Sequence, residues 1–168
     1  MKSRKPMVAG NWKMNKTLYE ARDLIRAILP EVDKVEGVDM VICPPHVCLG
    51  VAKRETEGSL LKVGAQNMHW EASGAYTGEI AAGMLADLCQ YVIIGHSERR
   101  AMFGETDLTV NKKVHAALKA GLTPIMCVGE TLSENQAGQT AAVVEGMVRG
   151  GLVEVTPEQA QNIIIAYE

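Results

Sequence analysis

Residues able to perform acid–base chemistry follow the short apolar segments of this chain. They are Asn11 and Lys13, Gln66 and Asn67, His96 and Glu98, Glu130, and Glu168. In folds that alternate strands with helices, the carboxyl ends of parallel strands share one edge, and that edge carries the chemistry. One edge would therefore gather a lysine, an imidazole and at least two carboxylates. Taken singly, each position is equally compatible with a polar residue that only marks where a strand leaves the core.

Three of these residues have the types needed to move a proton at a carbon beside a carbonyl. His96 lies between Gly95 and Ser97 at a strand-to-helix junction, where backbone N–H groups disfavour a second proton on the ring. We expect Ser97 to cap that helix. A neutral imidazole can donate a hydrogen bond to a carbonyl oxygen. The Lys13 ammonium can stabilise a bound anion or a developing enolate, and the Glu168 carboxylate can abstract a carbon-bound proton.

Two further patterns resemble metal-site signatures but lack the ligands that such sites need. The segment Cys43-Pro-Pro-His46-Val-Cys48 has no second ligand pair at zinc spacing, and its prolines stiffen it. His96-x-Glu98 resembles the start of the zinc-deaminase signature, but Cys127 stands alone where Pro-Cys-x-x-Cys is required. The turn after the first apolar run has one glycine, not the Gly-x-Gly-x-x-Gly of dinucleotide sites. These patterns therefore support neither a zinc site nor a dinucleotide site.

Six apolar runs alternate with segments of helical period, which predicts an α/β fold. The runs are Met7–Ala9, Met40–Cys43, Leu61–Val63, Tyr91–Ile94, Pro124–Val128 and Ile163–Ala166. Continuous apolar runs of this length are typical of strands that are covered on both faces. Their starts recur about every 31 residues, the size of a βα unit. Two architectures fit this pattern: an open doubly wound sheet, and an eight-stranded barrel of which six strands are present.

Capping signals predict where the helices begin and end. A capping box, Thr17-x-x-Glu20, opens a helix that Pro30 follows. A second helix covers 108–118, with Gly121 at its C-terminal end. Ser133-x-x-Gln136 caps a third helix that runs toward Gly150-Gly151. Thr156-Pro-Glu-Gln159 places Pro at the first position of a last short helix.

Composition predicts one domain, 1–168, in the cytoplasm. The net charge of −3 argues against a nucleic-acid partner, and no apolar run approaches the length of a membrane span. The start of the chain lacks an apolar segment long enough for a signal peptide. Cys43, Cys48, Cys89 and Cys127 are then expected to be reduced thiols.

Six motifs together resemble the successive signatures of the triosephosphate isomerase family. They are Gly10-Asn-Trp-Lys-Met-Asn15, Gly64-Ala-Gln-Asn67, Ser73-Gly-Ala-Tyr-Thr-Gly-Glu79, Tyr91-Val-Ile-Ile-Gly-His-Ser-Glu-Arg-Arg100, Cys127-Val-Gly-Glu130 and Ala166-Tyr-Glu168. They occur in the family's order and cover the whole chain. The resemblance implies a (βα)₈ barrel that interconverts dihydroxyacetone phosphate and glyceraldehyde 3-phosphate without cofactor or metal.

The resemblance also assigns roles to individual residues. Glu168 would shuttle the proton, His96 would polarise the carbonyl, and Lys13 would supply positive charge with Asn11 beside it. Thr77, Gly78 and Glu79 would belong to a loop that reaches a second subunit, which makes a homodimer the expected state. Ser97, Glu98, Cys127 and Glu130 would support the site.

The chain departs from the family pattern after Glu168. Family members continue into a mobile lid and two more βα units whose turns bind the substrate phosphate, so we expect a truncated barrel of the first six βα units. A complementary C-terminal chain is one expected partner. Two other hypotheses stay open: a non-catalytic barrel fragment that acts as an interaction module, and a different phosphosugar isomerase on the same scaffold.

Overall fold

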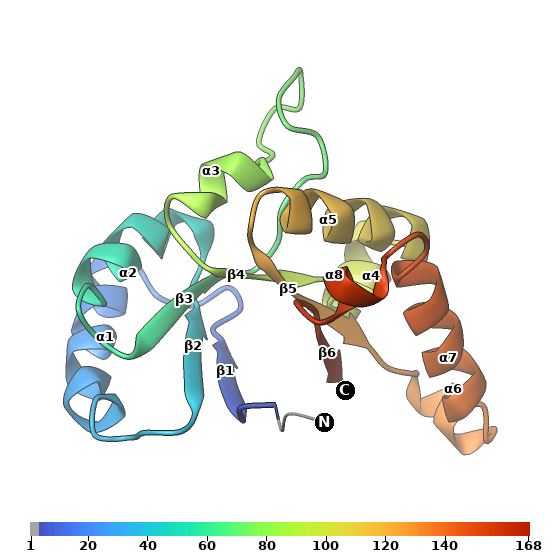
Figure 1. Ribbon diagram of the computed structural model, residues 1–168, viewed down its shortest axis with the longest axis horizontal. Coiled ribbons are helices and arrows are strands. Elements are labelled where there is room, and N and C mark those ends of the chain that lie inside the picture. Colours follow the sequence, from blue (N-terminus) through green and yellow to red (C-terminus); the bar gives the residue numbers. More distant parts are fainter. Residues whose placement is uncertain (1–3) are drawn as a thin grey trace.

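The computed structural model describes residues 4–168, which form a six-stranded sheet with strand order β1-β2-β3-β4-β5-β6 (Figure 1). The strands are β1 (Met7–Asn11), β2 (Asp39–Cys43), β3 (Leu61–Ala65), β4 (Tyr91–Ile94), β5 (Thr123–Val128) and β6 (Ile164–Tyr167). All six predicted strands are confirmed, with ends that differ by at most two residues. The basic start of the chain, in which we expect no signal peptide, includes residues 1–3, which lie outside the described residues.

The sheet curls into part of a barrel, so the open doubly wound alternative is wrong. Every neighbouring pair of strands runs parallel. Helices surround the outside of the curved sheet, and β1 and β6 flank its open side (Figure 1). Because each of these two strands has a neighbour on one side only, apolar residues such as Val8 and Ile165 stay 64% and 42% exposed. The predicted truncated barrel of six βα units is confirmed.

Apolar side chains pack on both faces of the sheet. The larger cluster lies between the strands and the helices and includes Ile25, Leu49 and Ile94. A smaller cluster, built on Val41 and Ile125, fills the inner face of the curved sheet. Burial on both faces is what the continuous apolar runs predict for strands inside a barrel wall.

Helices and one 3₁₀ turn connect the strands. They are α1 (Leu18–Val32), η1 (His46–Cys48), α2 (Leu49–Glu55), α3 (Ala82–Ala86), α4 (Ser97–Phe103), α5 (Asp107–Lys119), α6 (Leu132–Gln136), α7 (Thr140–Gly151) and α8 (Pro157–Ala160). The predicted caps at Thr17 and Thr156 are present, and each side chain accepts from the backbone N–H three residues on. Gly121 adopts a φ of +77° after α5, as its predicted C-terminal place requires.

Two predicted helix boundaries are wrong. The first helix continues past Pro30 to Val32, because a proline in the last turn removes one N–H but leaves Asp33 free to donate to the Leu29 carbonyl. The helix expected to start at Ser133 is instead capped by Thr131, whose hydroxyl accepts from the Glu134 N–H. It also ends early.

Gly138 explains that early end. Its φ of +71° places it in the left-handed region, which interrupts the helix and separates α6 from α7. The expected helix after His96 is present as α4, whereas periodicity does not predict η1, α2 and α3, since segments of so few residues show little of it. Among residues 4–168, no helix combines the length and the apolarity needed to cross a bilayer.

We expect Leu49→Ala to lower the free energy of unfolding by about 2–5 kcal/mol, because it opens a cavity in the larger apolar cluster. Leu49 is the first residue of α2 and is 1% exposed. Leu132 is the matched control, since it is the first residue of α6 and is 73% exposed. Leu132→Ala is expected to stay within about 0.5 kcal/mol of the parent. Urea unfolding followed by circular dichroism measures both, and equal losses would contradict the described packing.

Candidate active site

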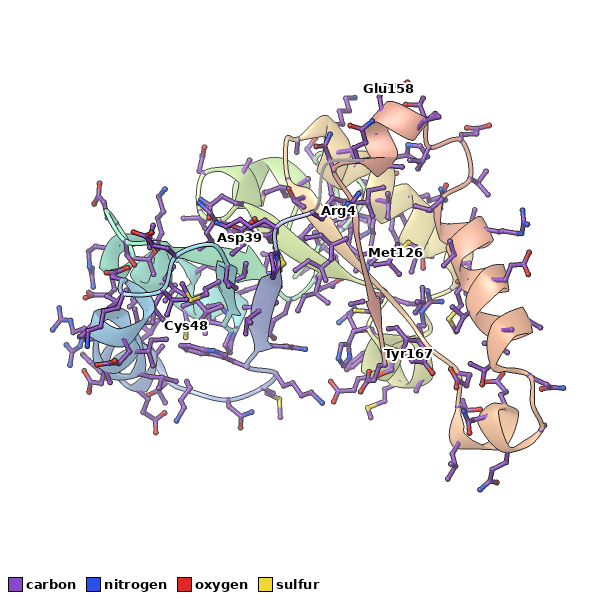
Figure 2. The ribbon with its side chains drawn as sticks, turned by 60° about the horizontal axis from the view of Figure 1, so that its bottom comes forward. Arg4, Asp39, Cys48, Met126, Glu158 and Tyr167 are labelled. Atoms are coloured by element: carbon purple, nitrogen blue, oxygen red, sulfur yellow. The ribbon has the colours of Figure 1, made fainter. Side chains whose placement is uncertain are left out.

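The last residues of the parallel strands form one edge, which we call the carboxyl rim (Asn11, Cys43, Ala65, Ile94, Val128 and Tyr167). Figure 2 shows Tyr167 at this end of β6, whereas Arg4, Asp39 and Glu158 lie toward the opposite end of the strands. Asn11, Lys13, His96 and Glu168 all lie at or just beyond the carboxyl rim. The sequence-based expectation that these side chains share one edge therefore agrees with the structure.

Lys13 is held in an unusual backbone conformation by two amide side chains. Its φ is +53°, in the left-handed region that costs free energy for a residue with a side chain. The Asn11 Oδ1 accepts a hydrogen bond from the Lys13 N–H at 3.0 Å. The Gln66 Nε2 donates to the Lys13 carbonyl at 2.9 Å and to the Cys43 carbonyl at 2.8 Å. These bonds fix the loop that carries the ammonium group.

The Lys13 ammonium is paired with a carboxylate in this structure. Its Nζ lies 2.7 Å from the Glu98 Oε1. The hydrogen bond and the charge of Glu98 raise the pKa of Lys13, and Lys13 in turn lowers the pKa of Glu98. Both side chains remain substantially exposed to solvent. Glu98 therefore orients a lysine that stays charged.

His96 caps α4 with its own ring, a role that we had expected Ser97 to fill. The His96 Nδ1 accepts a hydrogen bond from the Glu98 backbone N–H at 3.2 Å. A ring nitrogen that accepts carries no proton, so in the neutral imidazole the proton sits on Nε2. The side chain is 14% exposed, and its Nε2 lies 4.0 Å from the Glu168 Oε2. The ring is thus set to donate from Nε2 toward the space beside Glu168.

Glu168 is positioned by one contact to the end of β5 and one to the start of α4. Its backbone N–H donates to the Val128 carbonyl at 3.0 Å. Its Oε2 accepts a hydrogen bond of 2.7 Å from the Ser97 hydroxyl, which explains why Ser97 is not the helix cap. The carboxylate is 65% exposed, because β6 is an edge strand.

Two cavities meet at this edge and share Asn11 and His96. The larger, of about 660 Å³, is also lined by Lys13, Glu98 and Glu79. The smaller, of about 170 Å³, is also lined by Cys127 and Glu168. Polar and ionisable groups that end or follow β1, β4 and β6 therefore line two adjacent cavities at the carboxyl rim.

Cys127 and Glu130 lie beside the site and differ in their chemistry. Burial raises the pKa of the Cys127 thiol to about 11, so it remains protonated at neutral pH. The Glu130 Oε1 accepts hydrogen bonds from Asn135, Thr140 and Tyr167. These hydrogen bonds, of which the one from Asn135 has the largest effect, lower the pKa of Glu130 to about 2. Glu130 thereby links the loop after β5 to the end of β6.

The segment 43–48 is occupied by structural contacts. The His46 Nε2 lies 2.8 Å from the Asn67 carbonyl, and the Cys48 thiol donates to the Lys16 carbonyl at 3.8 Å. Within residues 4–168, no group of three His, Cys, Asp or Glu side chains is placed to hold a metal ion.

The loop that contains Thr77, Gly78 and Glu79 projects away from the body of the molecule (Figure 1). Residues 71–79 are exposed, and at the base of the loop His69 stacks on Trp70 and lies tilted against Tyr76. Gly78 and Glu79 line the larger cavity together with Lys13 and His96, whereas Thr77 does not. One side of the site is therefore bordered by a protruding loop.

The family model of triosephosphate isomerase matches residues 6–168. The chain belongs to the triosephosphate isomerase family. Triosephosphate isomerases of Carboxydothermus hydrogenoformans and Moorella thermoacetica are 54% and 51% identical to it over 98% of its length. The crystal structure of triosephosphate isomerase from Bartonella henselae superposes with a TM-score of 0.90 at 41% identity, covering 98% of this chain and 68% of that one.

The chain spans 66% of the length of these two curated family members. The matched part includes every residue of the triosephosphate isomerase resemblance, from Asn11 to Glu168. One contributor to the site was not assigned a role from the family motifs. Gln66 follows β3 and belongs to the motif Gly64-Ala-Gln-Asn67, and its side chain holds the Lys13 loop. Its contact to a carbonyl 53 positions away leaves no local signal in the sequence.

We expect Glu130→Gln to lower the melting temperature at pH 7, because the ionised carboxylate is the better acceptor for three donors. The pKa of Glu130 is about 2 in the folded chain and 4.5 ordinarily, so its ionised carboxylate contributes stability that is fully present above pH 4.5. It is lost as the pH falls toward 2. The difference in melting temperature between parent and variant should therefore shrink between about pH 5 and 2.5. A difference that stays constant across this range would contradict the assigned hydrogen bonds.

Proposed function

We propose that this chain carries the proton-transfer site of a triosephosphate isomerase. The reaction is the cofactor-independent interconversion of dihydroxyacetone phosphate and D-glyceraldehyde 3-phosphate. The observation that supports it most is the 4.0 Å approach of the His96 Nε2 to the Glu168 carboxylate, at the same strand edge as the Lys13 ammonium. An acid, a base and a cation on one edge are what proton transfer beside a carbonyl requires.

In this proposal Glu168 takes a proton from one carbon of the triose and returns it to the neighbouring carbon. Negative charge develops on the carbonyl oxygen in the enediolate between the two steps. The His96 Nε2–H donates to that oxygen, and Lys13 stabilises the charge. His96 gives its Nε2 proton to that oxygen and takes the hydroxyl proton from the neighbouring oxygen, so the O–H changes carbon as the C–H does and the imidazole ends neutral. Because Ser97 holds the Glu168 Oε2 in this structure, the carboxylate must exchange that hydrogen bond for the substrate.

The open side of the barrel supports a need for further polypeptide. An eight-stranded barrel requires two more strands than the six seen in residues 4–168, and β1 and β6 offer free edges of the right polarity. The family members are longer than the matched region by about a third of their length. We propose that a complementary C-terminal chain or segment completes the barrel. The same free edges favour the second candidate, an interaction module that binds another polypeptide.

We also propose that the active form is a homodimer. The protruding loop with Thr77, Gly78 and Glu79 is exposed and borders the cavity beside Lys13. An ordered loop with a stacked aromatic base is suited to reach a second copy.

A cytoplasmic location fits the free cysteines, since Cys43, Cys48, Cys89 and Cys127 form no disulfide in the described chain.

The isomerase assay tests the proposed function directly. Residues 1–168 alone are expected to show negligible turnover, because Glu168 lies on an exposed edge with no polypeptide to exclude water. Fusion to the remaining third of the Carboxydothermus hydrogenoformans enzyme, or addition of that third in trans, should give isomerase activity. A folded fusion protein without turnover would contradict the proposal. Robust turnover by residues 1–168 alone would contradict the need for further polypeptide.

In the active fusion, we expect Glu168→Asp to lower kcat about 100-fold with little change in KM. Shortening the side chain withdraws the carboxylate by roughly 1 Å from the reacting carbon. Glu158→Asp is the matched control, because Glu158 lies on α8 toward the opposite end of the strands (Figure 2). Its kcat should equal that of the parent. Steady-state kinetics in both reaction directions provide the measurement, and similar kcat values for the two variants would remove Glu168 from the role of base.

A further inference from the structure

The backbone of Glu168 passes over the backbone of Gly129, the first residue after β5. The Val128 carbonyl accepts from the Glu168 N–H, which brings the end of β6 directly against this turn. A Cβ placed on Gly129 would overlap the Glu168 carbonyl oxygen and would lie 3.2 Å from the Glu168 carbonyl carbon and 3.4 Å from its nitrogen. All three neighbours are backbone atoms, and the hydrogen bond from the Glu168 N–H to the Val128 carbonyl holds the nitrogen and the adjoining carbonyl carbon against the turn.

Space, and not backbone conformation, requires glycine at position 129. Its φ lies outside the left-handed region, in contrast to Gly95, Gly121 and Gly138. An alanine could therefore adopt the same backbone angles. Only the contact with Glu168 prevents an alanine at position 129.

Gly129 cannot retreat from this contact. Its N–H donates to the Met147 Sδ of α7 at 3.4 Å, so the turn is also held from the helix side. Val128, just before it, is 3% exposed and packs in the larger apolar cluster. Since β5 is anchored and β6 is an edge strand, a side chain at position 129 would displace Glu168.

Displacement of the Glu168 backbone moves the carboxylate away from His96 and Ser97. The Ser97 hydroxyl reaches the Glu168 Oε2 at 2.7 Å, and the His96 Nε2 lies 4.0 Å from the same oxygen. His96 and Ser97 follow β4, and neither is among the atoms nearest to a Cβ placed on Gly129. The relative placement of base and imidazole thus depends on how closely β6 approaches β5.

We propose that Gly129 is a positioning residue: the absence of a side chain there lets the end of β6 settle on the turn after β5, and this sets the place of the Glu168 carboxylate relative to His96. The catalytic meaning of this placement rests on the proposed function. The contact between the backbones of Gly129 and Glu168 does not depend on that function.

A thermodynamic cycle tests the contact. Gly129→Ala is made in residues 1–168 and in residues 1–167, which lack Glu168. The substitution should lower the melting temperature of the longer chain, and should have little effect on the shorter one. Failure of the variant to fold in the longer chain alone supports the proposal. An equal loss of melting temperature in both chains, or failure of both chains to fold, would overturn the proposal. Unchanged melting temperatures in both chains, together with unmoved NMR signals of Glu168, would also overturn it.

Gly146→Ala is the matched control. Gly146 lies in α7, one residue before Met147, and a Cβ there meets nothing within 4 Å. Its φ also lies outside the left-handed region. The control should keep the parent's melting temperature or raise it slightly, since alanine favours a helix. The backbone and carboxyl NMR signals of Glu168 should shift in Gly129→Ala and stay in place in Gly146→Ala.

Kinetics of the active fusion test the consequence for catalysis. At a temperature where both proteins are fully folded, Gly129→Ala should lower kcat about 10- to 100-fold and leave KM within about twofold. Gly146→Ala should match the parent. An unchanged kcat with Gly129→Ala would overturn the positioning role. A fusion without activity would instead contradict the proposed function, while the thermodynamic cycle and the NMR signals still decide the contact.

Discussion

Parallel pairing of the strands is the constraint on which the site depends. Each strand runs in the same direction as its neighbour, so all six end on one edge and all of the turns that follow them lie together. Residues that are 85 positions apart in the chain, such as Asn11 and His96, then line the same cavities. Antiparallel pairing would send alternate turns to opposite ends and would leave no shared edge.

The two sides of the site are held in different ways. Lys13 lies on a loop that amide side chains fix from β1 and β3, and its strained backbone shows how firmly that loop is held. Glu168 depends on one backbone hydrogen bond to β5 and one hydroxyl from α4. His96 caps α4, just after the inner strand β4, and its side chain is the least exposed of the three. The base is thus the group whose position is easiest to change.

The strands and several helix ends could be predicted from the sequence, because the signals that mark them lie within a few neighbouring residues. The apolar runs marked the strands, and the capping box at Thr17 and the glycine at position 121 marked helix ends. Competing local signals explain the errors: Thr131 and Ser133 both offer a hydroxyl, and only the first meets the backbone N–H. His96 takes the capping role that spacing assigns to Ser97, and the Ser97 hydroxyl instead donates to Glu168, 71 positions later. Contacts of that range, like those of Gln66 and Gly129, are visible only in the folded chain.

The order in which the strands leave the ribosome has a consequence for the site. Chains fold from the N-terminus as they are made, and β6 is the last of the six strands to emerge. The cationic loop and the imidazole can therefore find their places while the carboxylate is still inside the exit tunnel. During synthesis the site therefore holds its paired cation and its imidazole first, and it gains its proton acceptor only when β6 docks.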